Sequence, residues 1–369
     1  MSTTIDCATA NAADKALDKK IQRELIGVSD EVRARHSWLQ HQDAIGLSIF
    51  IVSIAGCIIN AWLYVQGVMP AWAVILGTAF WTSLLHELEH DLIHWMYFKK
   101  NKLVHQMMMA GVYLFRPFTA NPWVRRHLHF HHHKNSGTQT DIEERGITNG
   151  EKWGLRRFIM VGDNMLAVYL RAKKYLTEPS RLYREGKVTK QDLKNFRLIS
   201  LLTYQPLGVI SHTLWHGFIL IHVANGVAWL FGAQIPWPTL LLEQMPWITT
   251  LAVVLFAPNA LRTFCLHFIS SNMHYYGDNK PGFIVEQCQV MNVWWLAPLQ
   301  LFCFNFGTTH AIHHFVVRDP FYIRQMTASK ALPILKANGV RFNDMGTFKR
   351  ANRMHTQKQT SQNSAAIAA

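Results

Sequence analysis

The chain has 369 residues, of which 49% are apolar and only 16% are charged, whereas soluble domains usually contain about 25% charged residues. This balance excludes a disordered protein, a coiled coil and a collagen-like fibre, and the clumping of the apolar residues argues against an ordinary water-soluble domain. The formal net charge is +14, and the membrane topology described below explains this excess better than nucleic-acid binding does.

The predicted elements begin with a polar segment, residues 1–43, which should form one or two amphipathic helices on the surface. Roughly 20 apolar residues are needed to cross a bilayer core. Four membrane-spanning helices are predicted on this basis, at 44–65, from 71 onward, within 198–231 and at 247–269. The second helix runs from its apolar residues 71–85 into His86-Glu87-Leu88-Glu89-His90 without a helix breaker, so it should carry these histidines out of the bilayer.

Two later apolar segments need a more specific interpretation. The run 198–231 is 34 residues long and contains Pro206, which predicts a kink or an interfacial turn. The segment 290–306 is short and rich in Trp, so we interpret it as interfacial or buried rather than spanning. Residues 351–369 are predicted to be a disordered tail, which leaves 44–350 as one membrane-embedded domain.

Charge asymmetry orients the predicted spans. Residues 97–197 contain 20 Lys and Arg but only 8 Asp and Glu, whereas the connections 67–70 and 232–246 contain neither Lys nor Arg. The positive-inside rule then places these connections outside and both termini in the cytoplasm. The expected fold is an all-α, multi-pass integral membrane protein with about four transmembrane helices and a cytosolic helical cap, which carries all of the histidine clusters.

Ten of the 20 histidines are candidate metal ligands. The first cluster has the spacing HxxxHxxxH, and the second and third clusters both contain HxxHH, so each cluster aligns its rings along one helix face. A tenth histidine follows the fourth span. The candidates are His86, His90, His94, His129, His132, His133, His274, His310, His313 and His314.

Neutral imidazole binds Fe, Zn, Cu and Ni. A tetrahedral ion takes about four protein ligands, so ten candidates suit two ions better than one. His127 and His131 lie between the candidates of the second cluster, but helical spacing points them elsewhere and we expect neither to bind metal.

Two other classes of protein fit part of this pattern. The segment from His86 to His90 matches HExxH, the zinc metalloprotease helix. An intramembrane protease would use one zinc ion with Glu87 as general base, and it would leave the other clusters without a role. A non-catalytic metal-binding or transport protein should thread its acidic residues and histidines through several spans, whereas here they gather beyond the bilayer.

The order HxxxH, HxxHH, HxxHH, with hydrophobic hairpins between, resembles the membrane fatty acid desaturase and hydroxylase superfamily over roughly residues 44–320. The resemblance implies a cytosolic site for two Fe ions that caps a bundle of membrane helices. Such a site uses O2 and two electrons to oxidise an unactivated C–H bond of a fatty acyl chain. It also implies that the ligands are the candidates given above, with either His90 or His94 as the partner of His86.

The resemblance leaves the outcome of the oxidation open. Desaturation is the expected reaction, and the alternatives are alkyl hydroxylation and the oxidative decarboxylation of a fatty acid to a terminal alkene, because decarboxylases of this kind are similar to desaturases. Ser270 and Met273 stand where animal acyl-CoA desaturases have Asn and alkane hydroxylases have Glu, so the chain lies between subfamilies.

Fatty acid or fatty acyl substrate, membrane lipid and an electron donor are the expected partners, and nucleic acid is not. The sequence has no GxGxxG fingerprint and no haem or iron–sulfur motif, so the electrons should come from a small ferredoxin-, rubredoxin- or cytochrome-like protein. Basic residues could form its docking face, although they could equally bind anionic lipid headgroups. These residues are Arg125, Arg126, Lys134, Arg156 and Arg157.

Carboxylates near the clusters could orient the ligating imidazoles, but we expect each of them to be a solvated surface charge. They are Glu87, Glu89, Asp91, Asp141, Glu143, Glu144 and Asp278. Arg262 lies within the fourth predicted span, where we expect its side chain to snorkel toward the cytoplasmic interface.

Overall fold

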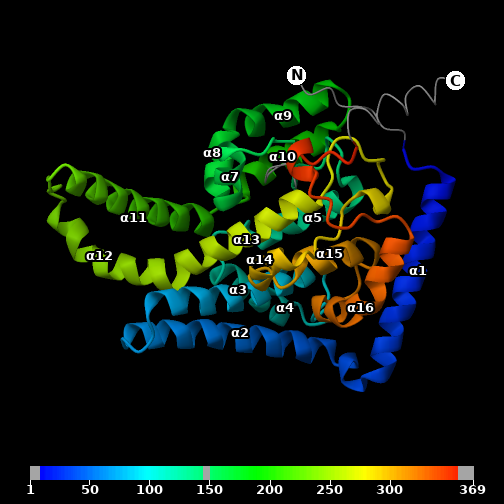
Figure 1. The fold of residues 1–369 in the computed structure, drawn as a ribbon, viewed down its shortest axis with the longest axis horizontal. Helices are drawn as coiled ribbons and strands as arrows, with labels where there is room; N and C mark the ends of the chain where they lie inside the picture. Colours follow the sequence, from blue (N-terminus) through cyan, green and yellow to red (C-terminus); the bar gives the residue numbers. More distant parts are fainter. Residues whose placement is uncertain (1–8, 144–149, 356–369) are drawn as a thin grey trace.

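The computed structural model describes residues 9–143 and 150–355 (Figure 1). Helices make up 72% of the structure, and the described ranges contain no strand, which confirms the predicted all-α class. Glu144 and most of the predicted C-terminal tail, 351–369, lie outside these ranges. The tail's first residues, 351–355, pack against the domain, where Asn352 is fully buried and donates a hydrogen bond of 3.0 Å to the carbonyl of His274.

The first helix, α1 (Ala12–Arg35), lies along one side of the molecule (Figure 1). It begins at a capping box in which the side chains of Asn11 and Asp14 each accept a hydrogen bond from the other residue's backbone N–H. Ile21 and Leu25 are buried in the core that α1 shares with α15 (Phe306–Phe315) and α16 (Phe321–Ala337). The helix is therefore held by segments at the other end of the chain.

A long antiparallel hairpin follows, formed by α2 (Gln42–Val65) and α3 (Ala71–Ile93). The two helices approach closely because α2 presents glycine to aromatic rings. A Cβ atom on Gly56 would lie 2.3 Å from the Trp81 ring, and one on Gly46 would lie 2.4 Å from the Tyr97 ring. The hairpin thus fixes the position of the histidines at the end of α3.

Within the described ranges, three helices are long and apolar enough to cross a membrane: α2, α11 (Leu207–Leu230) and the continuous stretch Thr239–Met273. They correspond to three of the four predicted spans. The remaining prediction, α3, is apolar only in its first part, and its C-terminal half is buried inside the protein. Its role as a fourth span stays a prediction.

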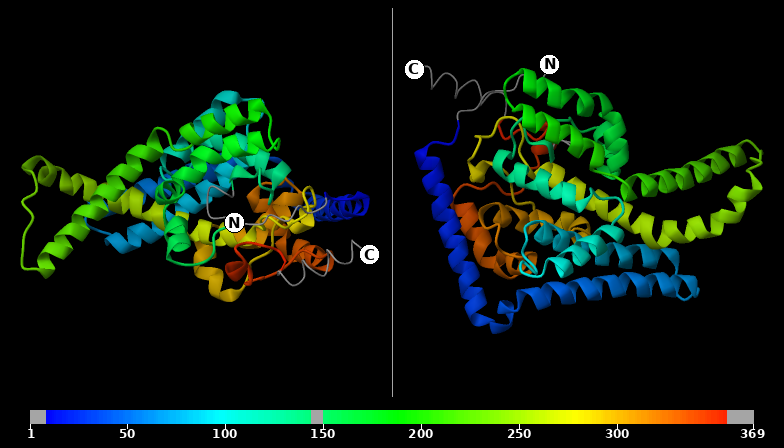
Figure 2. Two further views of the ribbon diagram at one scale, coloured as in Figure 1. Left: turned by 90° about the horizontal axis from the view of Figure 1, so that it is seen from above. Right: turned by 180° about the vertical axis from the view of Figure 1, so that it is seen from behind.

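The arm formed by α11 and α12 (Thr239–Leu251) extends well beyond the rest of the molecule (Figures 1 and 2). The predicted interruption near Pro206 is confirmed, because α10 (Lys190–Leu202) ends and α11 begins on either side of it. From α12 the chain continues through one π-helical turn, Ala252–Phe256, into α13 (Ala257–Met273), which returns to the body of the protein.

The remaining helices surround the inner ends of α3 and α13 (Figure 2). The predicted non-spanning segment 290–306 is confirmed, since it contains only a 3₁₀ turn, Trp294–Leu296, and the short helix α14. The bounds of the other helices are α4 (Lys102–Leu114), α5 (Pro122–Asn135), α7 (Leu155–Gly162), α8 (Asn164–Leu170), α9 (Ala172–Arg184), α14 (Ala297–Leu301) and α17 (Thr347–Arg350).

Candidate metal centre

The ends of α3 and α13 meet α5 and α15 near the centre of the molecule, and these four elements carry the predicted histidines (Figure 1). In the described part of the chain, the ring nitrogens of seven of these histidines gather at two places, each within 4.8 Å of one another. One set is His90, His94, His129 and His313, and the other is His132, His274 and His314.

Two more histidines join these sets through short contacts. Nε2 of His133 lies 3.1 Å from Nε2 of both His129 and His313. Nε2 of His310 lies 3.2 Å from Nε2 of His314. The first histidine group is therefore defined as His90, His94, His129, His133 and His313, and the second histidine group as His132, His274, His310 and His314.

His86 is the predicted ligand that the structure leaves outside both groups. It lies one helical turn before His90, its ring packs edge-on against Phe306, and its Nδ1 lies 3.3 Å from Oε1 of Glu87. The α3 histidines that face the other clusters are thus His90 and His94. Among the described residues, no group of three potential ligands contains both His86 and His90, so the geometry does not support a zinc protease site.

Hydrogen bonds at Nδ1 hold four of the rings in place. Nδ1 of His132 lies 2.8 Å from Oδ2 of Asp141, and Nδ1 of His129 lies 2.9 Å from Oε2 of Glu143. In the second group, the ring of His274 contacts the carbonyl of Ser270, at 3.0 Å. Similarly, Nδ1 of His314 lies 2.7 Å from Oε1 of Gln287. Each acceptor fixes the tautomer, because a neutral ring that donates from Nδ1 has a lone pair at Nε2.

These lone pairs point at one another. Nε2 of His274 lies 3.4 Å from Nε2 of His314, although both rings donate from Nδ1. Two nitrogen lone pairs at this distance repel unless a cation lies between them. Nitrogens bound at about 2.0–2.1 Å to one ion would be about 3.0–3.4 Å apart, which is the spacing found in both groups. The histidines therefore fit a metal ion at each group.

The protonation state of the rings also suits metal binding. Burial holds the pKa of His129, His310 and His313 well below the ordinary value for histidine. The rings are neutral as a result, which is the form of imidazole that binds metal. Neither ring nitrogen of buried His90 has a hydrogen-bond partner among the described residues, as expected for a side chain whose natural partner is an ion.

The expectation that the nearby carboxylates are solvated is wrong for those that the structure describes. Asp141 and Glu143 orient His132 and His129, as described above. Glu87 and Asp91 are fully buried and lie 3.4 and 3.2 Å from Arg324. The other two are also buried: Glu89 pairs with two arginines, and Asp278 accepts backbone N–H groups from residues 354 and 355.

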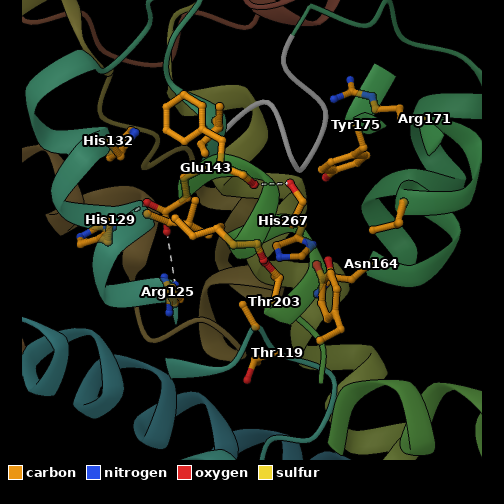
Figure 3. A pocket seen from close by; sticks show the side chains of 18 of the residues that line it. Thr119, Arg125, His129, His132, Glu143, Asn164, Arg171, Tyr175, Thr203 and His267 are labelled. Carbon is orange, nitrogen blue, oxygen red and sulfur yellow. Dashed lines mark hydrogen bonds and ion pairs between the residues drawn. The ribbon is translucent and has the colours of Figure 1, made fainter. Parts of the chain in front are cut away.

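A cavity of about 780 Å³ reaches both histidine groups, through His90 and His129 of the first and His132 and His310 of the second. Figure 3 shows His129 and His132 on one side of it, and Arg171 and Tyr175 on the other. Its walls come from α3, α5, α8, α9, α10, α13 and α15, and leucine, isoleucine, valine and aromatic side chains form much of the lining. The volume falls within the usual range for small-molecule sites, about 300–1,000 Å³.

Several basic residues lie elsewhere than the sequence suggested. Arg126 and Arg157 are buried, and only Lys134 and Arg156 of the five predicted docking residues are well exposed. Arg125 lies between Glu89 and Glu143 rather than on an open surface. Arg262 does not snorkel to an interface, since only 1% of it is exposed and it lines the cavity.

The fold and the site together define a class: an all-helical integral membrane protein with buried histidine groups beside a lipid-sized cavity. Comparison with protein families makes this assignment specific. Residues 66–346 match the fatty acid desaturase family, and because this match covers most of the chain, the protein belongs to that family. No curated protein matches the sequence significantly.

Membership of the family confirms the resemblance based on the histidine spacing. It indicates an oxidoreductase that acts on fatty acyl chains, and the histidine groups fit its use of metal. The missed features are Gln287 and the carbonyl of Ser270, which orient His314 and His274. No local pattern marks Gln287, because it contacts a residue far away in the sequence.

Proposed function

We propose that the protein is a di-iron, O2-dependent oxidase that desaturates a fatty acyl chain. The observation that carries the proposal is the pair of histidine groups, whose Nε2 atoms converge at 3.1–3.4 Å while carboxylates and carbonyls hold Nδ1. The proposed ligands are the five histidines of the first group and the four of the second. His86, which the sequence also suggested, lies outside both groups, and its role as a ligand stays a prediction.

Each iron ion, when bound, would supply part of the oxidising power needed to break an alkyl C–H bond with O2. The protein's own contribution is to hold the histidine rings in the orientation that binds metal. Asp141 and Glu143 keep Nδ1–H of their histidines engaged, so that Nε2 faces the metal. Each carboxylate accepts a hydrogen bond from Nδ1–H of its histidine, and both carboxylates are nearly enclosed by protein. Rotation of either histidine ring would therefore break a buried hydrogen bond.

The cavity supports a fatty acyl substrate. It is lined by residues of seven helices, and its apolar walls favour burial of methylene groups by about 0.8 kcal/mol for each CH₂. Because His129 and His132 line the same cavity, a chain that occupies it lies beside both histidine groups. Water is excluded from the part of the cavity that the chain fills.

The proposal includes a cytoplasmic site and an external electron donor. The topology rests on the excess of Lys and Arg in residues 97–197 and on their absence from both short connections. The exposed cations Lys134 and Arg156 are the remaining candidates for contact with an acidic redox protein. Protease protection of epitope tags placed at the two termini tests the orientation.

Two measurements test the proposed reaction. Metal analysis of the purified protein should find two Fe for each chain, whereas one Zn would indicate a protease-like site. Mass spectrometry of lipids and headspace volatiles from expressing cells should then find an unsaturated acyl product. A hydroxy acid or a shortened alkene would instead assign the same site to hydroxylation or decarboxylation.

A further inference from the structure

We propose that Arg116 and Arg262 form a carboxylate-binding site inside the cavity, so that the substrate binds as a free fatty acid. This inference rests on the proposed function, because it assigns the substrate class of the same site. Both side chains line the cavity that reaches the histidine groups. Arg116 follows α4, and Arg262 lies within α13.

The first argument is that both guanidinium groups are buried with donors left over. The exposed fractions are 0% for Arg116 and 1% for Arg262. Nε and Nη2 of Arg116, and Nε and Nη1 of Arg262, have no hydrogen-bond partner among the described residues. Arg262 donates only from Nη2, to Oγ1 of Thr263 at 2.9 Å. Four buried nitrogens thus lack an acceptor, although buried donors in proteins are nearly always paired.

The second argument is the charge at this wall of the cavity. Glu89 accepts hydrogen bonds from both Arg116 and Arg125. Glu143 is shared by Arg125 and the ring of His129, and Glu178, the other described carboxylate that lines the cavity, pairs with Arg181. Three guanidinium groups therefore face two carboxylates among the described residues, and Arg262 has no ion-pair partner there. Burial of an unpaired charge is unfavourable, so one negative charge is needed at Arg262.

Neighbouring acidic residues do not fill this need. Glu87 and Asp91, which also lie on α3, both contact Arg324. Arg262 itself lies in one of the stretches that are long enough to cross a membrane. An ionisable residue in such a segment usually has a functional partner. The partner that is missing here is an anion that can enter the cavity.

A fatty acid carboxylate has the required charge and geometry. It accepts two parallel hydrogen bonds from a guanidinium group, and such charge-assisted pairs are stronger than neutral ones. An ester or thioester carbonyl accepts a hydrogen bond but brings no negative charge. The carbonyl of Leu85 accepts from Nη1 of Arg116 at 3.3 Å, which places this guanidinium beside α3 one to two turns before His90. The site therefore lies next to the histidine groups.

Equilibrium binding of radiolabelled palmitic acid and methyl palmitate to the full-length protein in nanodiscs tests the site. The wild-type protein should bind the acid at least about 10-fold more tightly than the ester. Arg262→Gln should weaken binding of the acid about 10- to 100-fold and leave binding of the ester nearly unchanged. Arg262→Lys retains the positive charge but cannot donate two parallel hydrogen bonds, so it should weaken binding of the acid by an intermediate amount.

Arg197→Gln is the matched control. Arg197 also lines the cavity, on α10, but it donates to Oγ of Ser180 and is a cation at the protein surface. This substitution should leave the preference for acid over ester within about 3-fold of wild type. An equally large loss with Arg197→Gln would show that general cavity charge, not the buried pair, selects the acid, and would overturn the assignment.

Equal affinity of the wild-type protein for acid and ester also overturns the inference, and this comparison decides the matter even if Arg262→Gln does not fold. Product analysis separates the two proposals. Oxidation of methyl palmitate as readily as of palmitic acid would reject the carboxylate site and retain the oxidase. Selective binding of the acid without oxidation of any acyl substrate would retain the site and reject the oxidase.

Discussion

The histidine-bearing centre and the α11–α12 arm place their polar and apolar residues in opposite ways. At the centre, imidazoles, carboxylates and guanidinium groups are almost fully buried. On the arm, Leu220, Trp229 and Phe231 are 66%, 77% and 82% exposed. The difference shows that two environments hold the molecule together. Internal hydrogen bonds and ion pairs stabilise the centre, whereas the arm needs a surrounding hydrocarbon phase.

The largest effect is expected from a change to the histidine groups. His313→Ala or His132→Ala should abolish turnover and lower the iron content, because each removes a nitrogen from a converging set. Membrane insertion should persist, since the apolar helices are unchanged. His131→Ala is the control: Nε2 of His131 donates to the carbonyl of Thr140, at 2.9 Å, and the ring lies in neither group. Loss of iron in the His131→Ala variant would show that the ligands assigned within the second histidine cluster are wrong.

A change to the buried ion pairs should come next. Arg324→Leu leaves Glu87 and Asp91 buried without their shared cation, which should lower the free energy of unfolding by about 3–5 kcal/mol. The exposed pair of Arg318 and Asp30 gives the contrast. Arg318→Leu should change the free energy of unfolding by about 1 kcal/mol or less. Denaturant unfolding in detergent measures both, and equal effects would contradict the distinction between centre and surface.

The arm is tested by a charge on its apolar surface. Leu220→Lys on α11 should oppose membrane insertion by about 2.5–3.5 kcal/mol if this residue lies near the middle of a span. Leu155 on α7 is also highly exposed, at 75%, but it lies outside the candidate spans. Leu155→Lys should therefore change insertion by about 0.5 kcal/mol or less. Quantifying the membrane-inserted fraction of each variant checks the expectation.

The smallest expected effect is that of a residue that orients a ligand. Asp141→Asn keeps the shape of the side chain but removes its charge, and it should lower metal affinity or turnover about 10- to 100-fold. Asp30→Asn, on the exposed face of α1, should leave both unchanged. Iron retention during dialysis against a chelator ranks the metal affinity of the two variants and the wild type. Equal iron retention by the Asp141 variant and the wild type would show that the Asp141 carboxylate does not help His132 to bind metal.

Local spacing was sufficient to predict most of the histidine groups. HxxHH places its three rings on one helix face, so the converging histidines of α5 and α15 could be predicted from the sequence, together with His274. The choice within HxxxHxxxH could not be made, because residues four apart drift by only about 40° around a helix. Which two of His86, His90 and His94 face the other clusters depends on where α5 and α15 pack.

The buried charges could not be predicted for a related reason. Glu89 meets Arg116 after 27 residues and Asp91 meets Arg324 after 233 residues. Such pairs leave no periodic signal in the sequence, and an isolated carboxylate near a polar cluster looks like a surface residue. The prediction that Arg262 snorkels to the interface was wrong for the same reason. Whether this long side chain reaches an interface or the cavity depends on how its helix is rotated, which the sequence does not reveal.

The position of α1 has a consequence for the synthesis of the protein. Its contacts are with residues that are translated much later: Gln22 donates to the carbonyl of Phe315, at 3.0 Å, and Glu31 lies 2.7 Å from Lys330. Helix α1 therefore waits through the translation of some 300 residues before these partners exist. A chain that stops before α16 would leave part of the apolar side of α1 uncovered, which offers quality-control proteases a marker of an unfinished product.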